Sequence, residues 1–117
     1  MISRELIKGT LKYLVMNLLR TESRMYGYEI TRVLDEQSGS RIRLSFAALY
    51  PVLHKLEAEG MLCTETENVN NRIRKYYSLT DKGRKKAESL MLEFREYLVT
   101  MQTITADKNG LSEQRSD

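Results

Sequence analysis

The apolar residues of this 117-residue chain change their spacing at Met61, and this change restricts the folds that the chain can form. Before Met61, apolar side chains recur every three or four residues, which is the period of an amphipathic helix. From Met61 to Leu79 they alternate with polar side chains, which is the period of a β-strand. After Thr80 the helical period returns. The sequence therefore predicts helices, then one hairpin, then a final helix.

Two helices are predicted in the first third of the chain. The first spans about residues 3–20 and the second about residues 26–37. Gly39 follows the second helix and is suited to a left-handed cap. A brief extended segment is expected over residues 42–44, where apolar and basic residues alternate.

A third helix is predicted to begin near Ser45, whose hydroxyl suits an N-cap, and to end at Gly60. Pro51 lacks an N–H group, so this helix either starts nearer Ala47 or is distorted at its beginning. Its buried stripe has helical spacing and consists of Leu49, Val52, Leu53 and Leu56.

The hairpin is predicted from two strands, residues 61–67 and 72–79, joined by an asparagine-rich turn. Thr80 then caps a long helix. The apolar stripe of that helix continues to Ile104 and comprises Ala87, Leu90, Met91, Phe94, Leu98, Met101 and Ile104.

Three helices followed by a hairpin are the order of a winged helix-turn-helix. The expected fold is mainly α, with a small two-stranded antiparallel β-wing and an added C-terminal dimerisation helix. We expect residues 1–80 to form the winged-helix DNA-binding domain and residues 81–106 to form the dimerisation helix of the same unit. Residues 107–117 are polar and aperiodic, which predicts a disordered tail.

Positive charge is concentrated between Arg72 and Lys86, where seven basic residues face a single acid, Asp81. A solvated, lysine-rich surface is one interpretation of such a run. However, Arg84–Lys86 fall in the first turns of the last helix, where the helix dipole disfavours cations. An anionic partner such as a phosphate would explain their position.

The third helix carries the side chains suited to reading DNA. The residues that its buried stripe leaves facing outward or sideways are Ala48, Tyr50, Pro51, His54 and Lys55. Helix-turn-helix proteins place the N-terminal half of this helix in the major groove, where small residues allow close approach and donors meet base edges. An ordinary exposed histidine is the alternative interpretation of His54.

The sequence contains few of the residue patterns that enzymes use for catalysis. One histidine and one cysteine do not make the usual metal clusters, and no nucleophile elbow or P-loop is present. We expect no enzyme activity, no metal and no cofactor. Cys63 is interpreted as a buried small hydrophobic residue, with a sensor as the alternative. No apolar run approaches the ~20 residues of a membrane span, and we expect a cytoplasmic protein.

Three ordered blocks resemble the PadR family of transcription regulators. They are YGYEI at residues 26–30, ALYPVLHKLEAEGML at residues 48–62 and RIRKYYSLTDKG at residues 72–83. With the flanking helices, the resemblance covers about residues 4–105 and points to the short subfamily with one C-terminal helix.

The resemblance implies a homodimeric repressor that binds a palindromic operator. It implies a phosphate contact from Tyr26, groove contacts from Tyr50 and its neighbours, and wing contacts from the basic hairpin. The sequence departs from the family pattern in two places: Ala47-Ala48 replaces Gly-Thr, and Asn71 replaces a glycine. The residues expected to contact DNA are Tyr26, Ser45, Ala48, Tyr50, His54, Lys55, Arg72, Arg74 and Lys75.

A lone final helix with an apolar stripe indicates a homodimer, since a partner helix would cover the stripe. Some family members stack flat aromatic drugs on a tryptophan of this helix; this chain has no tryptophan and carries Phe94 at the aligned position. Plain dimer core is therefore preferred, with a small aromatic effector as the alternative. The residues assigned to this interface or pocket are Leu11, Val15, Met16, Leu90, Met91, Phe94, Leu98 and Met101.

Two other functions remain open at this point. One is a winged-helix protein-interaction module whose basic wing docks on an acidic partner. The other is a small-molecule-binding dimer with secondary DNA activity.

Overall fold

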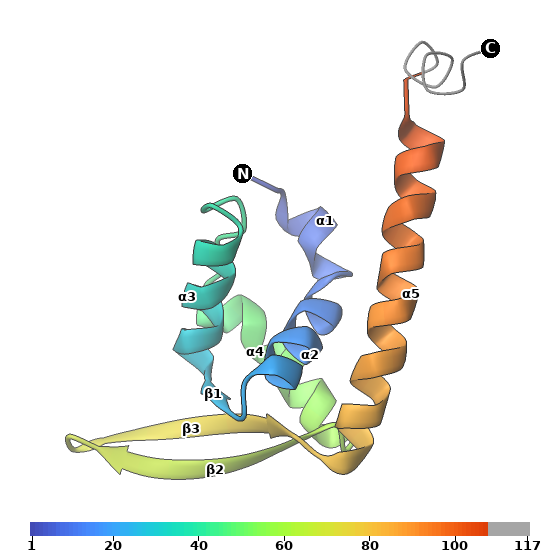
Figure 1. Ribbon diagram of the computed structural model, residues 1–117. Coiled ribbons are helices and arrows are strands. Elements are labelled where there is room, and N and C mark those ends of the chain that lie inside the picture. The colour runs from blue at the N-terminus through green and yellow to red at the C-terminus, as the bar shows by residue number, and fades with distance from the viewer. Residues whose placement is uncertain (108–117) are drawn as a thin grey trace.

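In the described part of the chain, four helices and a small sheet form the body of the protein, and a fifth, long helix leaves it (Figure 1). The computed structural model describes residues 1–107, so most of the predicted tail, residues 108–117, lies outside the described residues. In chain order the elements are α1 (Arg4–Lys8), α2 (Leu11–Thr21), β1 (Met25–Tyr26), α3 (Gly27–Gln37), α4 (Phe46–Ala58), β2 (Leu62–Val69), β3 (Arg72–Leu79) and α5 (Asp81–Thr105).

The core lies where α2, α3 and α4 meet above the sheet (Figure 1). Each helix contributes the apolar stripe that its 3.6-residue period places on one face. The most completely buried large side chains are Tyr77, Met16, Leu19, Ile30, Leu49, Leu53 and Val15. The sheet adds Tyr77 from β3, so the base of the wing is fixed to the helical body.

The predicted first helix, residues 3–20, is two helices in the structure. α1 ends at Lys8, and α2 begins at Leu11. Gly9 has low helix propensity, and the Thr10 N–H donates to the Ile7 carbonyl at 2.8 Å, which tightens the turn. The break lets Ile7 reach the core from a helix that runs in a new direction.

Helix α4 begins as the sequence predicts. The Ser45 hydroxyl accepts a hydrogen bond from the Ala48 N–H at 3.2 Å, and the helix runs from Phe46 through Pro51. Because Pro51 has no N–H, the Ala47 carbonyl lacks its usual partner one turn later. The extended segment predicted at residues 42–44 is not a strand: these residues have no regular structure, and Ile42 and Leu44 pack against the core.

The sheet has three antiparallel strands in the order β1-β3-β2, one more than predicted. The extra strand, β1, is only two residues long and pairs Met25 with Tyr77 and Tyr26 with Tyr76. β2 and β3 form the predicted hairpin, and Asn70 and Asn71 turn it with positive φ angles of 51° and 64°. Since β1 ends at Tyr26, the outer part of β3 keeps an edge without a neighbouring strand on that side.

The junction between the wing and α5 is tightly built. The Thr80 hydroxyl accepts from the Gly83 N–H at 3.0 Å and lies 2.6 Å from the Gly60 carbonyl oxygen, to which it donates. Gly83 packs so closely on the Met61 carbonyl that a Cβ atom there would lie 2.0 Å from the Met61 oxygen. These contacts fix the direction in which α5 leaves the body.

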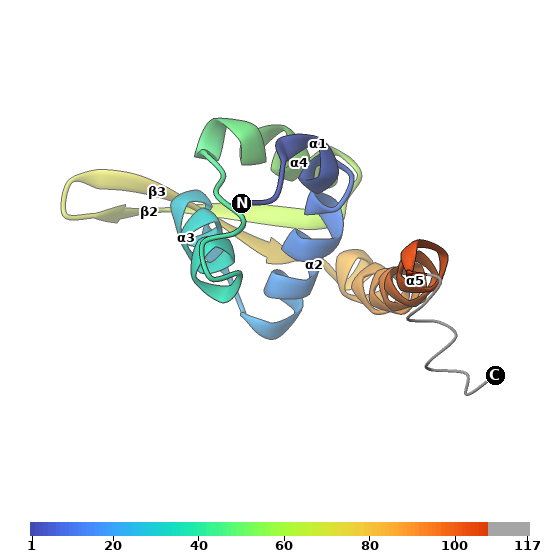
Figure 2. The same ribbon diagram turned by 90° about the horizontal axis from the view of Figure 1, so that it is seen from above.

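Helix α5 is covered only in its first half. Its buried residues are Gly83, Ala87, Leu90 and Met91, and the remaining turns extend past the helical body (Figures 1 and 2). Among residues 1–107, no helix combines the length and the apolar character that a membrane crossing requires.

Candidate nucleic-acid interface

A row of aromatic rings runs along the outward side of α4. The rings of Phe46 and Tyr50 lie 5.8 Å apart, and those of Tyr50 and His54 stack at the same distance. Tyr28, at the start of α3, extends the row by stacking on Phe46 at 5.4 Å. The spacing of four residues puts Phe46, Tyr50 and His54 on one face of the helix. The sequence-based predictions include Tyr50 and His54 but not Phe46 or Tyr28. The four-residue spacing of Phe46, Tyr50 and His54 could have indicated Phe46, whereas Tyr28 is on another helix.

The other predicted α4 residues differ in what they offer. Lys55 is exposed, Ala48 is half-buried, and the oxygen of Ser45 caps the helix. The helix N-terminus carries partial positive charge, which favours anions nearby. The exposed part of α4 therefore presents aromatic rings and a positive helix end, with a lysine in the last turn.

We call the row of Tyr28, Phe46, Tyr50 and His54 the aromatic ridge. A groove of about 580 Å³ lies between this ridge and the wing, and we call it the wing groove. Three basic residues line it and no acidic residue does. Its floor and walls are formed by Tyr26, Gly27, Tyr28, Phe46, Tyr50, Arg72, Ile73, Arg74, Lys75 and Tyr77. The groove therefore favours an anionic ligand.

Gly27 makes the narrow end of the wing groove possible. A Cβ atom at this position would lie 2.0 Å from the Phe46 ring, so only glycine lets α3 and α4 approach this closely. Tyr26 precedes it at the end of β1, and its N–H donates to the Glu29 carboxylate at 3.3 Å. The structure thus brings Tyr26 beside the wing, as the predicted phosphate contact requires.

The predicted wing cations have different surroundings. Arg72 is exposed near the tip, and the Arg74 guanidinium lies 4.5 Å from the centre of the Tyr26 ring. Lys75 points to the other face, where its ammonium is 3.6 Å from a Glu57 carboxylate oxygen of α4. Glu57 also accepts a hydrogen bond from Thr64. Lys75 therefore joins the wing to α4, while Arg72 and Arg74 have no ion pair among residues 1–107.

The acidic side of the wing is partly neutralised by a residue that is absent from the sequence-based predictions. The two Arg24 NH groups bind Glu65 at 2.6 Å and Glu67 at 2.8 Å, and the guanidinium lies 4.0 Å from the Tyr76 ring centre. These hydrogen bonds, with Glu67 the larger cause, raise the pKa of Arg24. The wing therefore keeps its positive residues available on β3.

Tyr77 closes the inner end of the wing groove. Burial raises the pKa of its hydroxyl, and the positive charge of Lys75 acts in the opposite direction. The phenol therefore stays protonated and can donate a hydrogen bond at neutral pH.

The residues predicted for a dimer interface fall into two groups. Leu11, Val15, Met16, Leu90 and Met91 are buried inside the protomer itself, so its own core already covers them. Phe94 and Met101 are half-buried, and Leu98 is 46% exposed. Only this second group, on the free half of α5, is available to a partner.

Phe94 lies against α2. Its ring stacks on Tyr13 at 5.3 Å, and the Tyr13 hydroxyl donates to Glu93. This hydrogen bond, together with burial, raises the pKa of Tyr13. A groove of about 370 Å³, which we call the α5 groove, is lined by Glu5, Leu6, Gly9, Thr10, Tyr13, Glu93, Phe94 and Tyr97.

Among residues 1–107, no three His, Cys, Asp or Glu side chains gather in a way that could hold a metal ion. Cys63 is exposed, contrary to the buried position expected for it, and its sulfur lies 3.3 Å from the Ser78 hydroxyl.

Comparison with known proteins agrees with this arrangement. The family described as "Transcriptional regulator PadR-like family" matches residues 15–89. The negative transcriptional regulator PadR of Bacillus subtilis is 32% identical over 83 residues, which are 70% of this chain and 45% of that protein. The chain therefore spans less than half of that relative.

Solved structures show the same fold. A PadR family regulator from Eggerthella lenta is 29% identical with a TM-score of 0.72, covering 88% of each chain. A transcriptional regulator from Clostridium thermocellum superposes with a TM-score of 0.77 at 23% identity, covering 90% of this chain and 99% of that one. Bacillus subtilis PadR in complex with operator DNA superposes with a TM-score of 0.63 at 24% identity, covering 79% and 60%.

The family match includes α3, α4, the wing and the start of α5, which are the elements that build the ridge and the wing groove. It confirms the resemblance seen in the three sequence blocks and the winged-helix fold class. Its members are regulators rather than enzymes. This chain belongs to the PadR-like family of transcriptional regulators.

Proposed function

We propose that this protein is a repressor that binds a palindromic operator as a homodimer, with the N-terminal half of α4 in the major groove. The observation that carries the proposal is the wing groove, which has three cations and no acid in its lining and borders the exposed ridge of α4. Regulation of the negative kind is supported by the name of the Bacillus subtilis relative.

The ridge and the wing have different parts in this proposal. Tyr50 and His54 carry hydrogen-bonding groups on an exposed helix face, which suits base edges in the major groove. Arg72 and Arg74 lie on the open edge of β3, which suits phosphates of the backbone beside that groove. Tyr26 lies under Arg74 and adds a hydroxyl to the same phosphate path.

The test is binding of the purified protein to fragments of genomic DNA at two salt concentrations. Each phosphate that the protein neutralises lowers the logarithm of the affinity by about 0.9 per logarithmic unit of salt. We expect a steep slope, together with a small set of retained promoter fragments that share a palindrome in a footprint. Absence of duplex binding at low salt would overturn the proposal.

A protein-interaction module is the alternative that shares the basic wing. Such a module would bind its acidic partner in a salt-dependent way and would not bind duplex DNA. The aromatic ridge favours DNA, since an acidic protein surface would need the cations of the wing but not the polar rings of α4.

The homodimer is supported by the free half of α5. Leu98, Val99 and Ile104 are exposed there. Because a helix with this much uncovered apolar surface is usually buried in an interface, we infer that a partner covers it. The stripe that begins at Ala87 against the body continues through Phe94, Leu98 and Met101. Sedimentation should give twice the chain mass; a monomer at micromolar concentration would contradict the dimer.

A small aromatic effector has a candidate place in the α5 groove. Tyr13, Phe94 and Tyr97 supply aromatic surfaces, and two carboxylates lie beside them, which favours a flat ligand with positive charge. Titration with a planar cationic dye tests this: Phe94→Ala should abolish binding, whereas equal affinity of that variant would contradict the site.

A further inference from the structure

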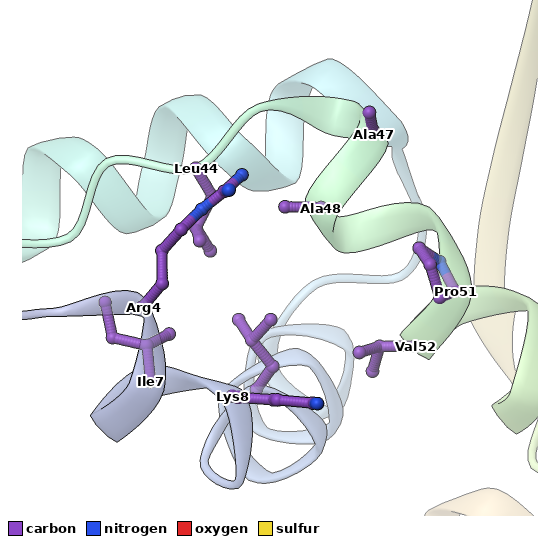
Figure 3. Close-up of a pocket in the computed structure, with 9 residues that line it drawn as sticks. Arg4, Ile7, Lys8, Leu44, Ala47, Ala48, Pro51 and Val52 are labelled. Carbon is purple, nitrogen blue, oxygen red and sulfur yellow. The ribbon is translucent and has the colours of Figure 1, made fainter.

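Helix α4 has a groove on each side. Opposite the wing groove lies a hollow of about 530 Å³ between α1 and α4, which we call the α1 groove. Figure 3 shows Ala48, Pro51 and Val52 of α4 facing the side chains of α1 across it. The lining comprises Arg4, Ile7, Lys8, Leu11, Leu44, Ala47, Ala48, Pro51 and Val52.

The α1 groove shares its charge pattern with the wing groove. Arg4 and Lys8 are exposed at its mouth, and no acidic residue lines it (Figure 3). Neither cation forms a salt bridge within residues 1–107, where Arg24, Arg32, Arg43 and Lys75 all do. The α5 groove, by contrast, contains Glu5 and Glu93. Positive charge without compensation therefore flanks α4 on both sides.

The shape of duplex DNA matches two basic grooves around one helix. A helix with its side chains is about 10–12 Å across, and the major groove is about 12 Å wide. A helix in this groove therefore has one sugar–phosphate backbone on each flank. In the proposed docking, the wing groove takes one backbone, and the α1 groove lies where the other must pass.

We propose that Arg4 and Lys8 bind phosphates of the second DNA strand, so that α1 forms the other half of a two-sided clamp around α4. The inference rests on the proposed DNA binding and names a surface that the wing does not supply. The apolar wall of Pro51, Val52 and Ile7 suits the deoxyribose faces between phosphates. The small side chains of Ala47 and Ala48 keep the hollow open.

Salt titration of Arg4→Gln/Lys8→Gln tests the clamp. The probe is a mixed-sequence duplex, since phosphate contacts do not depend on base sequence. In a dimer each substitution removes two contacts, so the salt slope should fall by about 2 per residue, or by about 4 for the double variant. Affinity at low salt should fall at least roughly tenfold for each of the two cations.

Lys12→Gln is the matched control. It removes the same charge one turn after Lys8, from a side chain that lies over the Tyr13 ring at 5.1 Å on the side of α5. Its slope and affinity should match the wild type. Thermal unfolding of Arg4→Gln/Lys8→Gln should be unchanged, because Arg4 and Lys8 form no ion pair to lose within residues 1–107.

The outcomes separate this inference from the proposed function. If wild-type protein binds the duplex and Arg4→Gln/Lys8→Gln binds it with the same affinity and slope, the clamp is wrong while DNA binding stands. An equal loss in Lys12→Gln would also overturn it, since the effect would then be general charge. If the wild type binds no duplex, both proposals fail. Ethylation interference on the operator should show one group of phosphates on each strand within every half-site in the wild type, and only the wing group within every half-site in the double variant.

Discussion

At the scale of single residues, the proposed interface divides into groups expected to contact the DNA backbone and groups expected to contact bases. Arg74 lies on the strand edge over Tyr26, while Tyr50 and His54 stand on the exposed face of α4. A contact to phosphate weakens binding to every sequence alike when it is lost, whereas a contact to a base edge also alters which sequence is preferred. The two kinds of residue are therefore distinguishable by experiment.

We predict that Arg74→Ala lowers affinity for operator and mixed-sequence duplexes by the same factor, roughly tenfold, and lowers the salt slope by about 2 in a dimer. Tyr50→Ala and His54→Ala should reduce operator affinity more than mixed-sequence affinity. Anisotropy titrations with both duplexes measure this. Altered preference in Arg74→Ala with intact affinity would show that the roles are reversed.

Gly83 is the residue whose replacement should damage the fold most simply. Its Cβ position lies 2.0 Å from the Met61 carbonyl oxygen, and neither backbone segment can move without shifting α5 or β2. We predict that Gly83→Ala lowers the free energy of unfolding by about 3 kcal/mol and the Tm by more than about 10 °C. Gly9→Ala is the control, because nothing lies within 4 Å of its Cβ position. A wild-type Tm for Gly83→Ala would contradict this close contact.

Tyr77 makes stability depend on pH in alkaline solution. Burial raises its pKa above the ordinary value of 10.0, so the unfolded chain releases this proton before the folded protein does. The contribution of protonated Tyr77 to the free energy of unfolding is therefore complete below pH 10.0 and is lost as pH rises through the pKa of Tyr77 in the folded protein. Tyr77→Phe keeps the buried ring and should show a smaller fall in unfolding free energy above pH 10 than the wild type, measured by urea denaturation. An identical alkaline fall would assign it to other groups, such as Tyr13.

At the scale of secondary-structure elements, the sequence predicts those with a long period and misses those set by tertiary contacts. Helix α4 is found from its stripe and the Ser45 cap, and the hairpin from its alternation and Asn70–Asn71. β1 has two residues, too few for any period, and exists because β3 offers it an edge. The break at Gly9 interrupts a continuous apolar stripe, so periodicity alone joins α1 to α2.

The functional surface shows the same division. Individual cations and α4 residues are predictable from sequence, because spacing places them outward. The grooves on the two sides of α4 are not, since each joins elements distant in the chain, such as α1 with α4. The Arg24 bridge is equally hidden, because it spans 41 residues to Glu65 and 43 to Glu67.

The wing depends as an element on that bridge. Without Arg24, the carboxylates of Glu65 and Glu67 would be unpaired beside β3, the strand proposed to contact DNA. We predict that Arg24→Ala weakens duplex binding roughly fivefold, which corresponds to about 1 kcal/mol. Adding Glu65→Gln and Glu67→Gln to Arg24→Ala should restore most of the affinity, because the repulsion is then gone. Failure of this rescue would mean that Arg24 itself contacts DNA.

At the scale of the whole molecule, the two ends of α5 have different roles. The first turns of α5 pack against the wing junction through Thr80 and Gly83. Because α5 is about 37 Å long, its last turns extend beyond the body (Figure 1). A partner held by the free turns would therefore be fixed relative to both wings. Dimerisation then sets the spacing of the two α4 helices, which a palindromic operator requires.

We predict that Leu98→Glu converts the protein to a monomer, because it places a charge in the middle of the apolar stripe that the partner would cover. Thr103→Glu is the matched control: it adds the same charge on the side of α5 opposite the stripe, where Thr103 is exposed. Sedimentation velocity measures both.

The Leu98→Glu monomer should keep its melting profile, since Leu98 is 46% exposed in the protomer. Its affinity for the full palindrome should fall by about 10²–10⁴, because the two half-sites are no longer bound by linked domains, while half-site affinity stays the same. A dimeric Leu98→Glu would move the interface off this stripe, and a monomer that still bound the palindrome at wild-type affinity would separate DNA recognition from dimerisation altogether.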